Sequence, residues 1–583
     1  MASSMESNNG SSIEKNYSEN TYNVRECREE TEIDGYTIPV KSKVLVNVWA
    51  IGRDPKSWED PESFIPERFE NSSVDFSGTH FQFLPFDAGR RTCPGRLFGL
   101  ALEIQQIITF FLFISFLFFL IHKLRIKTKK SYNKKILPPG PWRLPIIGSV
   151  HHLTKGIPHH VLKNLSQKFG PIMYLQLGEV PTIVVSSPHM AQKIMKAHDL
   201  TFASRSQTML GKIFCYDCTD IAFSPYGEYW RHMRKLCIME LLSAKMVKSF
   251  SPIRLDELSS LVSSIKSMEN TPINVSEKLF WFMNSVTCRS SFGKACKDQN
   301  EAMISLIHGV LSLAGGFELA DLYPSKKFLS GISGMGSKLI EACNKVDVVL
   351  DKVIDVHREN HANGKKCNAE CGSNEDLIDV FFRVMGTGEL PFTLTNNNIK
   401  AVILDMFVAG SDTSSSTVAW ALSEMMKSPS VMTKAQVEMR EVFKGKKTFD
   451  DDDLEKLDYL KLVIKETLRL HPPTPLLVPR ECREETEIDG YTIPVKSKVL
   501  VNVWAIGRDP KVGKIQKVLY QRDLRIIQLT LVELTFNFFP HLLYNFDWTL
   551  PNGMDPKDLD MNEANGMTAR RDKDLYLIAT PYT

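Results

Sequence analysis

The distribution of hydrophobic and polar residues divides this chain of 583 residues into five stretches. Residues 1–24 are rich in Ser, Asn, Glu and Tyr and almost lack aliphatic clusters, so we expect a disordered tail there. Residues 25–105 contain a repeat and a glycine-rich loop, residues 106–122 are almost continuously apolar, and residues 123–141 are basic and then rich in proline. Residues 142–583 are the body, and from about residue 142 to residue 480 it shows mostly helical periodicity, broken by Gly, Pro and a few short β-rich runs. The pattern predicts a mainly α body with small β-sheets, preceded by an N-terminal extension and a single membrane-anchor helix.

The apolar run Ile107–Ile121 is the candidate anchor. Its 15 residues would span about 22 Å as a helix, which is less than a bilayer core of about 30 Å. Flanking side chains that snorkel can supply the difference, although a helix buried in a protein core has a similar length. The flank favours a membrane, because seven cationic residues follow within 14 positions: Lys123, Arg125, Lys127, Lys129, Lys130, Lys134 and Lys135.

The charges on the two sides of this run predict its orientation. The 20 residues before Ile107 contain three Lys or Arg, and the 20 residues after Ile121 contain seven. By the positive-inside rule, the C-terminal body faces the cytosol and residues 1–106 face the lumen. In that case the Asn-x-Ser sequences that begin at Asn9, Asn16 and Asn71 become glycosylation acceptors.

The chain also contains one perfect internal repeat. Residues 25–56 and 480–511 are identical over 32 positions, whereas solenoid repeats are approximate, numerous and adjacent. Two perfect copies so far apart indicate a recent duplication or a spliced-together gene model. The first copy runs on through Pro66-Glu67-Arg68-Phe69 to the glycine-rich loop, and the second continues into residues 512–531, which resemble no segment we know.

Composition limits the possible functions. The net charge of +3 argues against a nucleic-acid partner, and 43% hydrophobic with 24% charged residues is ordinary for a globular protein. The eleven cysteines are scattered without a zinc or disulfide framework. We therefore expect reduced thiols in a protein that faces the cytosol.

The strongest chemical signal is the loop Phe86-Asp87-Ala88-Gly89-Arg90-Arg91-Thr92-Cys93-Pro94-Gly95. A thiol must lose its proton to bind a metal, and nearby positive charge favours the thiolate of Cys93. Gly89 and Gly95 allow the backbone to turn tightly and to approach a bound group closely. The alternative is a glycine-rich surface turn with a free cysteine.

A second signal lies within the helical stretch 398–426. Gly410 costs a helix about 1 kcal/mol relative to Ala. Its presence in the sequence Ala409-Gly410-Ser411-Asp412-Thr413 therefore indicates that this part of the helix has a local role. A turn or capping cluster of small polar residues is the alternative.

Two pairs of residues at helical spacing complete the set of candidates. Glu466 and Arg469 lie one turn apart, although such i,i+3 pairs are common on solvated helices. Trp230 and Arg234 also share one helix face, and an indole N–H and a guanidinium can both bind a carboxylate. Core packing of Trp230 beside a solvated Arg234 is the alternative.

Together these motifs resemble those of the plant microsomal cytochromes P450, the haem-thiolate monooxygenases. The spacing Phe-x-x-Gly-x-Arg-x-Cys-x-Gly at residues 86–95 is similar to their haem-binding loop. The proline hinge, the 398–426 helix and the C-terminal residues, including Phe546-Asp547-Trp548, look most like the solanaceous premnaspirodiene oxygenase group of terpenoid hydroxylases.

The resemblance implies the cytochrome P450 fold and haem b, with Cys93 as the metal ligand. Asp412 and Thr413 would be the catalytic residues that deliver protons. Further cofactor-binding roles are implied for Trp230, Arg234, Arg480, Phe86, Arg91 and Gly95. The implied setting is the endoplasmic reticulum membrane. NADPH–cytochrome P450 reductase would be the partner, and the substrate would be small, apolar and sesquiterpenoid.

Candidate substrate contacts are likewise implied only by the resemblance. They are Thr413, Leu476, Leu477 and Met567. The pair Glu466 and Arg469 would hold the loop region that carries the haem ligand, together with Arg68, which is a structural role.

The order of the parts departs from the family. Residues 57–100, which carry Arg68 and Cys93, precede the body instead of following the strand pair at 480–511. No cysteine follows Cys482, so Cys93 is the only plausible thiolate ligand.

This displacement leaves two hypotheses open. If residues 1–106 are lumenal, Cys93 and Thr413 lie on opposite faces of the membrane, and the chain is a haem-free product of a rearranged or mis-joined gene. If residues 25–101 stay on the cytosolic side, they can dock where the missing piece belongs, and the chain is a membrane-anchored monooxygenase.

Overall fold

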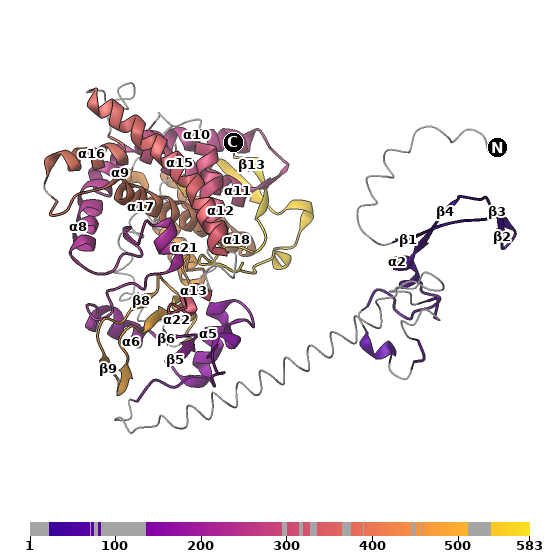
Figure 1. Ribbon diagram of the computed structural model, residues 1–583. Coiled ribbons are helices and arrows are strands. Elements are labelled where there is room, and N and C mark those ends of the chain that lie inside the picture. Colours follow the sequence, from indigo (N-terminus) through magenta and orange to yellow (C-terminus); the bar gives the residue numbers. More distant parts are fainter. Residues whose placement is uncertain are drawn as a thin grey trace, which may run out of the picture. The chain divides into compact units, whose positions relative to one another are not determined.

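The computed structural model divides the chain into two compact units, residues 1–132 and 133–583 (Figure 1). In the first unit it describes residues 22–63, 65–69, 72–74 and 80–82; in the second it describes residues 136–293, 300–313, 319–326, 335–363, 375–388, 390–444, 446, 451–454, 456–510 and 538–582. Within these ranges no helix is both long and apolar enough to cross a bilayer. The predicted anchor at 106–122, most of the hinge, the glycine-rich loop and residues 512–531 lie outside the described residues.

The described residues of the N-terminal unit form small β-hairpins and short helical turns. Its elements are β1 (Tyr22–Glu26), β2 (Thr31–Ile33), β3 (Tyr36–Ile38), β4 (Lys43–Asn47), α2 (Val48–Ile51) and a 3₁₀ turn at Pro66–Phe69. β1 pairs with β4 and β2 pairs with β3, both antiparallel. The β2–β3 hairpin turns at Asp34-Gly35, where both residues have positive φ, 47° and 82°, as a type I′ turn requires. β1 begins at Tyr22, so the last three residues of the predicted disordered tail are in a strand.

The second unit, which we call the body, is mainly helical, as predicted. Its α-helices are α4 (Val150–Leu153), α5 (Pro158–Phe169), α6 (Pro188–Gln192), α7 (Met209–Phe214), α8 (Glu228–Leu236), α9 (Ala244–Ser249), α10 (Ser251–Lys266), α11 (Val275–Phe292), α12 (Asn300–Leu313), α13 (Leu319–Leu322), α15 (Met335–Ala362), α16 (Leu377–Thr387), α17 (Asn396–Phe407), α18 (Thr413–Lys427), α19 (Pro429–Val442), α20 (Asp451–Leu454), α21 (Asp458–Leu470) and α22 (Val503–Gly507). Three π-helical turns lie at Lys193–Ala197, Cys237–Leu241 and Val408–Asp412.

Among the described residues of the body, three small sheets accompany these helices. The largest has the strand order β5-β6-β11-β8, in which β11 runs parallel to β6 and antiparallel to β8. The others are β12-β13-β7 and the hairpin β9-β10. Their bounds are β5 (Ile172–Leu177), β6 (Val180–Val185), β7 (Pro272–Asn274), β8 (Arg480–Glu481), β9 (Thr486–Ile488), β10 (Tyr491–Ile493), β11 (Lys498–Val501), β12 (Phe546–Thr549) and β13 (Tyr576–Pro581). In Figure 1 the four-stranded sheet with α5, α6 and α22 forms one end of the body, and the long helices form the other.

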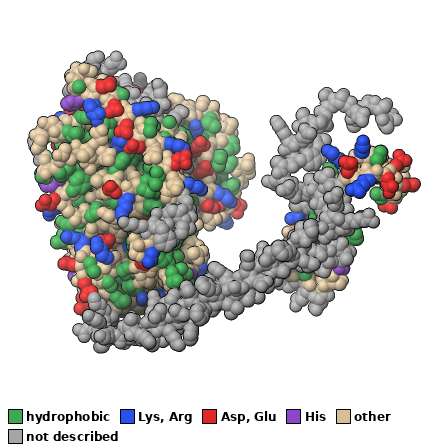
Figure 2. Space-filling view, viewed as in Figure 1, with side chains coloured by type: hydrophobic (Ala, Val, Ile, Leu, Met, Phe, Trp, Pro, Cys, Tyr) green, Lys and Arg blue, Asp and Glu red, His purple; other side chains and the backbone are tan. Residues whose placement is uncertain are grey.

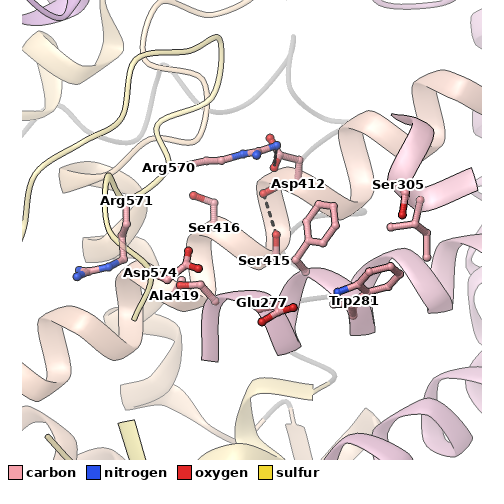
Figure 3. Close-up of a pocket in the computed structure, with 13 residues that line it drawn as sticks. Glu277, Trp281, Ser305, Asp412, Ser415, Ser416, Ala419, Arg570, Arg571 and Asp574 are labelled. Carbon is pink, nitrogen blue, oxygen red and sulfur yellow. Dashed lines mark hydrogen bonds and ion pairs between the residues drawn. The ribbon is translucent and has the colours of Figure 1, made fainter. Parts of the chain in front are cut away.

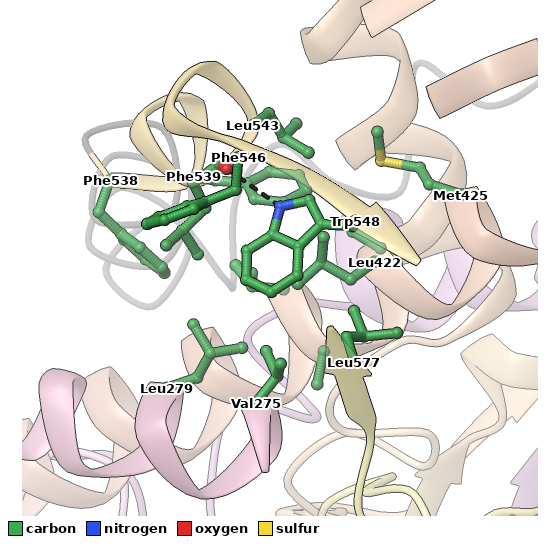
Figure 4. Close-up of a cluster of buried hydrophobic side chains, with 14 of the residues drawn as sticks. Val275, Leu279, Leu422, Met425, Phe538, Phe539, Leu543, Phe546, Trp548 and Leu577 are labelled. Atoms are coloured by element: carbon green, nitrogen blue, oxygen red, sulfur yellow. Dashed lines mark hydrogen bonds between the residues drawn. The ribbon is translucent and has the colours of Figure 1, made fainter. Parts of the chain in front are cut away.

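The core of the body is built around α17 and α18. One apolar cluster joins α18 to α10, α11, α19, α21 and the C-terminal segment, and Figure 4 shows part of it, with Phe539, Phe546 and Trp548 packed over Leu422. A second cluster joins α17 to α8, α15 and α16. Figure 2 shows cationic and anionic side chains interspersed over the visible face of the body, consistent with the small net charge of +3.

The two identical segments fold in the same way locally. Cα partners Arg25 and Val44 in the first copy correspond to partners Arg480 and Val499 in the second. Each copy has a positive-φ Asp-Gly turn, and each short helix is capped by an asparagine that accepts from the N–H three residues later. The environments differ, because Val44 is 40% exposed and Val499 is 1% exposed.

Helix α21 provides a test of where the core lies. Leu460 is fully buried and Leu462 is 57% exposed on the same helix. We expect Leu460→Ala to lower the free energy of unfolding of the body by about 2–5 kcal/mol, and Leu462→Ala to change it by less than about 0.5 kcal/mol. Urea unfolding of both variants measures the difference; equal losses would contradict this packing.

Candidate active site

The first candidate residues lie at the junction of α17, the π turn Val408–Asp412 and α18. The predicted helical stretch 398–426 falls within this run. The Thr413 hydroxyl donates to the Ala409 carbonyl oxygen at 2.5 Å, which ties the start of α18 to the π turn. π turns are frequent at functional sites because they widen the helix locally, here beside the side-chain-free Gly410.

Asp412 lies on the wall of a cavity of about 380 Å³ between α11, α12, α18 and the C-terminal segment. Its carboxylate is 4% exposed and forms an ion pair with Arg570. Figure 3 shows the two side chains pointing toward each other. The same wall carries other charged and hydroxyl side chains: Glu277, Arg571, Asp574, Ser415 and Ser416. A polar cavity of this size can hold water next to the Asp412 carboxylate.

Trp230 and Arg234 share one face of α8, as their spacing predicted. The Arg234 Cζ lies 5.4 Å from the centroid of the Trp230 ring, in cation–π geometry. The Trp230 indole N–H donates to the Ile221 carbonyl oxygen at 3.0 Å. This bond fixes α8 to the loop at residues 220–223.

Two arginines lie beside that loop and its neighbours. Arg480 is 5% exposed and donates from Nη1 to Asp199 Oδ1 at 3.4 Å. Arg205 donates from Nε to the Ala222 carbonyl oxygen at 3.1 Å and from Nη1 to the Val478 carbonyl oxygen at 2.9 Å. Arg205 was not among the sequence candidates, since a single arginine in a loop carries no recognisable spacing.

The positive charge of this arginine pair is only partly neutralised. Burial, and then repulsion from Arg480, lowers the pKa of Arg205 to about 9, and Asp220 and Asp199 offset part of this shift. Burial likewise lowers the pKa of Arg480. Asp199 forms an ion pair with Arg480, and the two guanidinium groups are charge-assisted donors of the kind that bind carboxylates. The described residues therefore fit the propionate groups of haem.

Three cysteines in the described part of the body, Cys215, Cys218 and Cys482, do not suit a metal-ligand role. Burial raises the pKa of Cys482 to about 11 and that of Cys218 to about 12, and it raises the pKa of Cys215 well above its usual value. A thiol held protonated in this way is a poor metal ligand. The predicted ligand Cys93 and its neighbours Phe86, Arg91 and Gly95 lie outside the described residues.

The pair Glu466 and Arg469 is formed, with hydrogen bonds of 2.7 and 2.5 Å from the guanidinium to the carboxylate. Arg469 also donates to the Gly507 carbonyl oxygen at 2.6 Å and so ties α21 to α22. Arg68, the expected third member, donates to carbonyl oxygens of its own unit, including Glu59 O at 2.7 Å. The pair therefore joins two helices of the body, whereas its expected role in holding the haem loop with Arg68 stays a prediction, because that loop lies outside the described residues.

None of the four expected substrate contacts is among the residues that line the 380 Å³ cavity. Leu476 packs against the apolar cluster that contains α5 and β5, whereas Leu477 packs against the cluster around β11.

Comparison with known proteins identifies the fold and its family. The family model described as Cytochrome P450 matches residues 19–131 and 138–512. The chain belongs to the cytochrome P450 family. It is 52% identical to premnaspirodiene oxygenase of Hyoscyamus muticus over 504 residues, covering 82% of this chain and 99% of that protein. It is 49% identical to 5-epiaristolochene 1,3-dihydroxylase of Nicotiana tabacum over 506 residues, covering 82% and 99% of the two chains.

Solved structures agree on the fold of this cytochrome P450. A zebra fish cytochrome P450 solved with progesterone superposes with a TM-score of 0.60 at 21% identity, covering 73% of this chain and 99% of that one. The predicted mainly helical cytochrome P450 fold with small sheets is confirmed. Membership of the monooxygenase family implies a haem-thiolate cofactor, a reductase partner and a small substrate.

A buried polar network at the sheet end of the body gave no sequence signal. Glu563 is 8% exposed; its Oε2 lies 2.6 Å from His159 Nε2 and its Oε1 accepts from Trp504 Nε1 at 2.9 Å. It therefore joins α5, α22 and the C-terminal segment, which are far apart in the sequence. His159 and Glu563 are separated by 404 positions.

The charge state of Glu563 gives a pH-dependent prediction. Burial alone would raise its pKa, but hydrogen bonds from His159, His471 and Trp504 more than offset this and lower the pKa well below its usual range. The stabilisation is therefore present above the unfolded pKa of about 4.3 and is lost as the pH falls toward the folded value.

We expect Glu563→Gln to destabilise the protein at pH 7 by about 1–3 kcal/mol, and this deficit to shrink as the pH is lowered through 4. Urea unfolding at several pH values measures it. The exposed Glu359→Gln is the control, and a deficit that stays constant with pH would contradict the ionised network.

Proposed function

We propose that this cytochrome P450 is a haem-dependent monooxygenase that hydroxylates a small, apolar, sesquiterpenoid substrate. Dioxygen would be the oxidant, and NADPH–cytochrome P450 reductase would supply the electrons. The observation that carries the proposal is the 52% identity to a premnaspirodiene oxygenase along 99% of that protein. The name of the tobacco relative, a 5-epiaristolochene 1,3-dihydroxylase, supports the same substrate class and reaction.

In this proposal the arginine cluster holds the haem propionates. Arg480 and Arg234 keep the role expected of them, and Arg205, beside Arg480, is a further guanidinium donor. Trp230 was expected to donate as well, but its indole N–H donates to the Ile221 carbonyl oxygen, so its part would be to position Arg234 through the cation–π contact. Cys93 would be the ligand of the iron, while Phe86, Arg91 and Gly95 would shape its loop. Haem, when bound, supplies the activation of dioxygen for insertion of one oxygen atom into a C–H bond.

Asp412 and Thr413 would deliver protons to the haem site. The ion pair with Arg570 holds the Asp412 carboxylate at the cavity wall, where water can exchange protons with it. The Thr413 hydroxyl, held by the Ala409 carbonyl oxygen, would orient the last transfer. Thr413, Leu476, Leu477 and Met567 remain the proposed substrate contacts.

The position of Cys93 defines the alternative function. We place the body at the cytosolic face of the endoplasmic reticulum, anchored by residues 106–122. If residues 1–106 are lumenal, as the flanking charges predict, a bilayer separates Cys93 from the arginine cluster. The chain would then be a haem-free membrane protein from a rearranged gene.

The carbon monoxide difference spectrum separates the two functions. We expect the reduced, purified full chain to bind carbon monoxide with the absorption of a thiolate-ligated haem, and Cys93→Ser to abolish it. Cys343→Ser in the body is the control and should leave the spectrum unchanged. Retained absorption in the Cys93 variant would refute the assignment, and haem-free wild-type protein would favour the alternative.

Glycosylation of protein made in microsomes tests the membrane orientation. If residues 1–106 are lumenal, Asn9, Asn16 or Asn71 acquires glycans that an endoglycosidase removes. The body sequences Asn164-Leu165-Ser166 and Asn274-Val275-Ser276 are internal controls that should stay unmodified in the cytosol. No mobility shift from an intact, inserted chain would contradict the lumenal placement and leave the monooxygenase arrangement possible.

A further inference from the structure

The two copies of the 32-residue repeat have the same local structure but unequal surroundings. In the second copy Val499 and Leu500 are 1% and 2% exposed, because β11 lies in the four-stranded sheet between β6 and β8. In the first copy the corresponding Val44 and Leu45 are 40% and 47% exposed. The first copy thus presents an apolar strand for which the body contains a matching site.

The contacts that hold the second copy are ones that the first copy can also make. β11 pairs in parallel with β6, from Lys498 opposite Thr182 to Val501 opposite Val185. The Glu481 N–H donates to the Ser204 carbonyl oxygen at 2.7 Å. These are backbone bonds.

The side chains that complete the site are identical as well. Asn502 donates from Nδ2 to the His159 carbonyl oxygen at 2.9 Å, and Trp504 donates to Glu563 at 2.9 Å. Residues 25–56 supply the same side chains at the same register. The site beside β6 therefore cannot distinguish the two copies by contact energy.

We propose that, where no bilayer separates the two copies, residues 25–56 exchange with residues 480–511 and occupy the site beside β6 of the same molecule. Only the chain connections decide between the two occupants, because the contacts are equivalent. Residues 480–511 are joined to the body at both ends and are favoured at rest. Loop closure costs grow slowly with length, so the tethered first copy competes at a high effective concentration and replaces the second copy whenever that copy is weakened.

The exchange changes which chain segment follows the strand that is bound beside β6. After residues 25–56 the chain continues into residues 57–100, which contain Cys93, whereas after residues 480–511 it continues into residues 512–531. Exchange would therefore deliver Cys93 to the body through the same strand that now leads to a segment without cysteine. This consequence rests on the proposed monooxygenase function, but the exchange itself does not.

A double-mutant cycle tests the exchange, because the repeat provides a matched control at every position. The full chain would be translated into detergent micelles, where no bilayer separates the two copies. Val499→Asp buries a charge in the second copy, and Val44→Asp makes the same change at the exposed position.

We expect each single variant to keep a cooperative melting transition of the body, since one intact copy remains to fill the site. The double variant should lose that transition. If Val499→Asp alone melts as the double variant does, the first copy does not replace the second, and the proposal is overturned.

A disulfide trap identifies the occupant directly. Lys498→Cys with Thr182→Cys is the positive control, because these residues are Cα partners across β11 and β6. In the Val499→Asp background, Lys43→Cys with Thr182→Cys should form an intramolecular disulfide that mass spectrometry detects as a linked peptide. Failure to form it while the control forms, or formation only between two molecules, would overturn the proposal.

The same samples separate this inference from the haem assignment. A trapped 43–182 disulfide without carbon monoxide absorption would leave the exchange standing and refute the proposed function. Carbon monoxide absorption without the disulfide would overturn the exchange and leave the proposed function standing.

Discussion

The enclosure of α17 and α18 by the rest of the body is the constraint on which the site depends. Side chains are buried along almost the whole length of both helices, so their polar groups depend on partners inside the protein, and the Ser414 hydroxyl is an exception that has none among the described residues. Thr413 satisfies the Ala409 carbonyl oxygen, and Ser416 donates to the Ala569 carbonyl oxygen at 3.0 Å. The same requirement sets the ion pair of Asp412 with Arg570. The helix thereby orders the C-terminal segment that completes the cavity.

Burial also lowers the pKa values of the two arginines of the cluster, Arg205 and Arg480. Both side chains are desolvated more than their acidic neighbours compensate. Asp199 forms an ion pair with Arg480, and the two guanidinium groups are donors of the kind that bind carboxylates. In the proposed function this is why they would hold the propionates of the cofactor, wherever the metal ligand lies.

Sequence patterns identified the residues with regular spacing and missed those defined by contact. Trp230 with Arg234, and Glu466 with Arg469, lie one helical turn apart, and helix geometry alone brings each pair together. Arg205 follows no such period, and neither does Glu563, which pairs with histidines some 400 positions away. Long-range pairs of this kind depend on how elements pack, and periodicity carries no information about that.

The repeat shows most clearly which features the local sequence determines and which the tertiary structure determines. The 32 shared residues by themselves determined the strand register, the Asp-Gly turn and the asparagine cap, since both copies have them. These features depend on interactions between residues close along the chain. Only the tertiary structure decided that Val499 is buried and Val44 is exposed, because burial requires a surface such as β6 that lies elsewhere in the chain. The segment's own sequence therefore determines its local geometry, whereas the elements packed around it determine its burial.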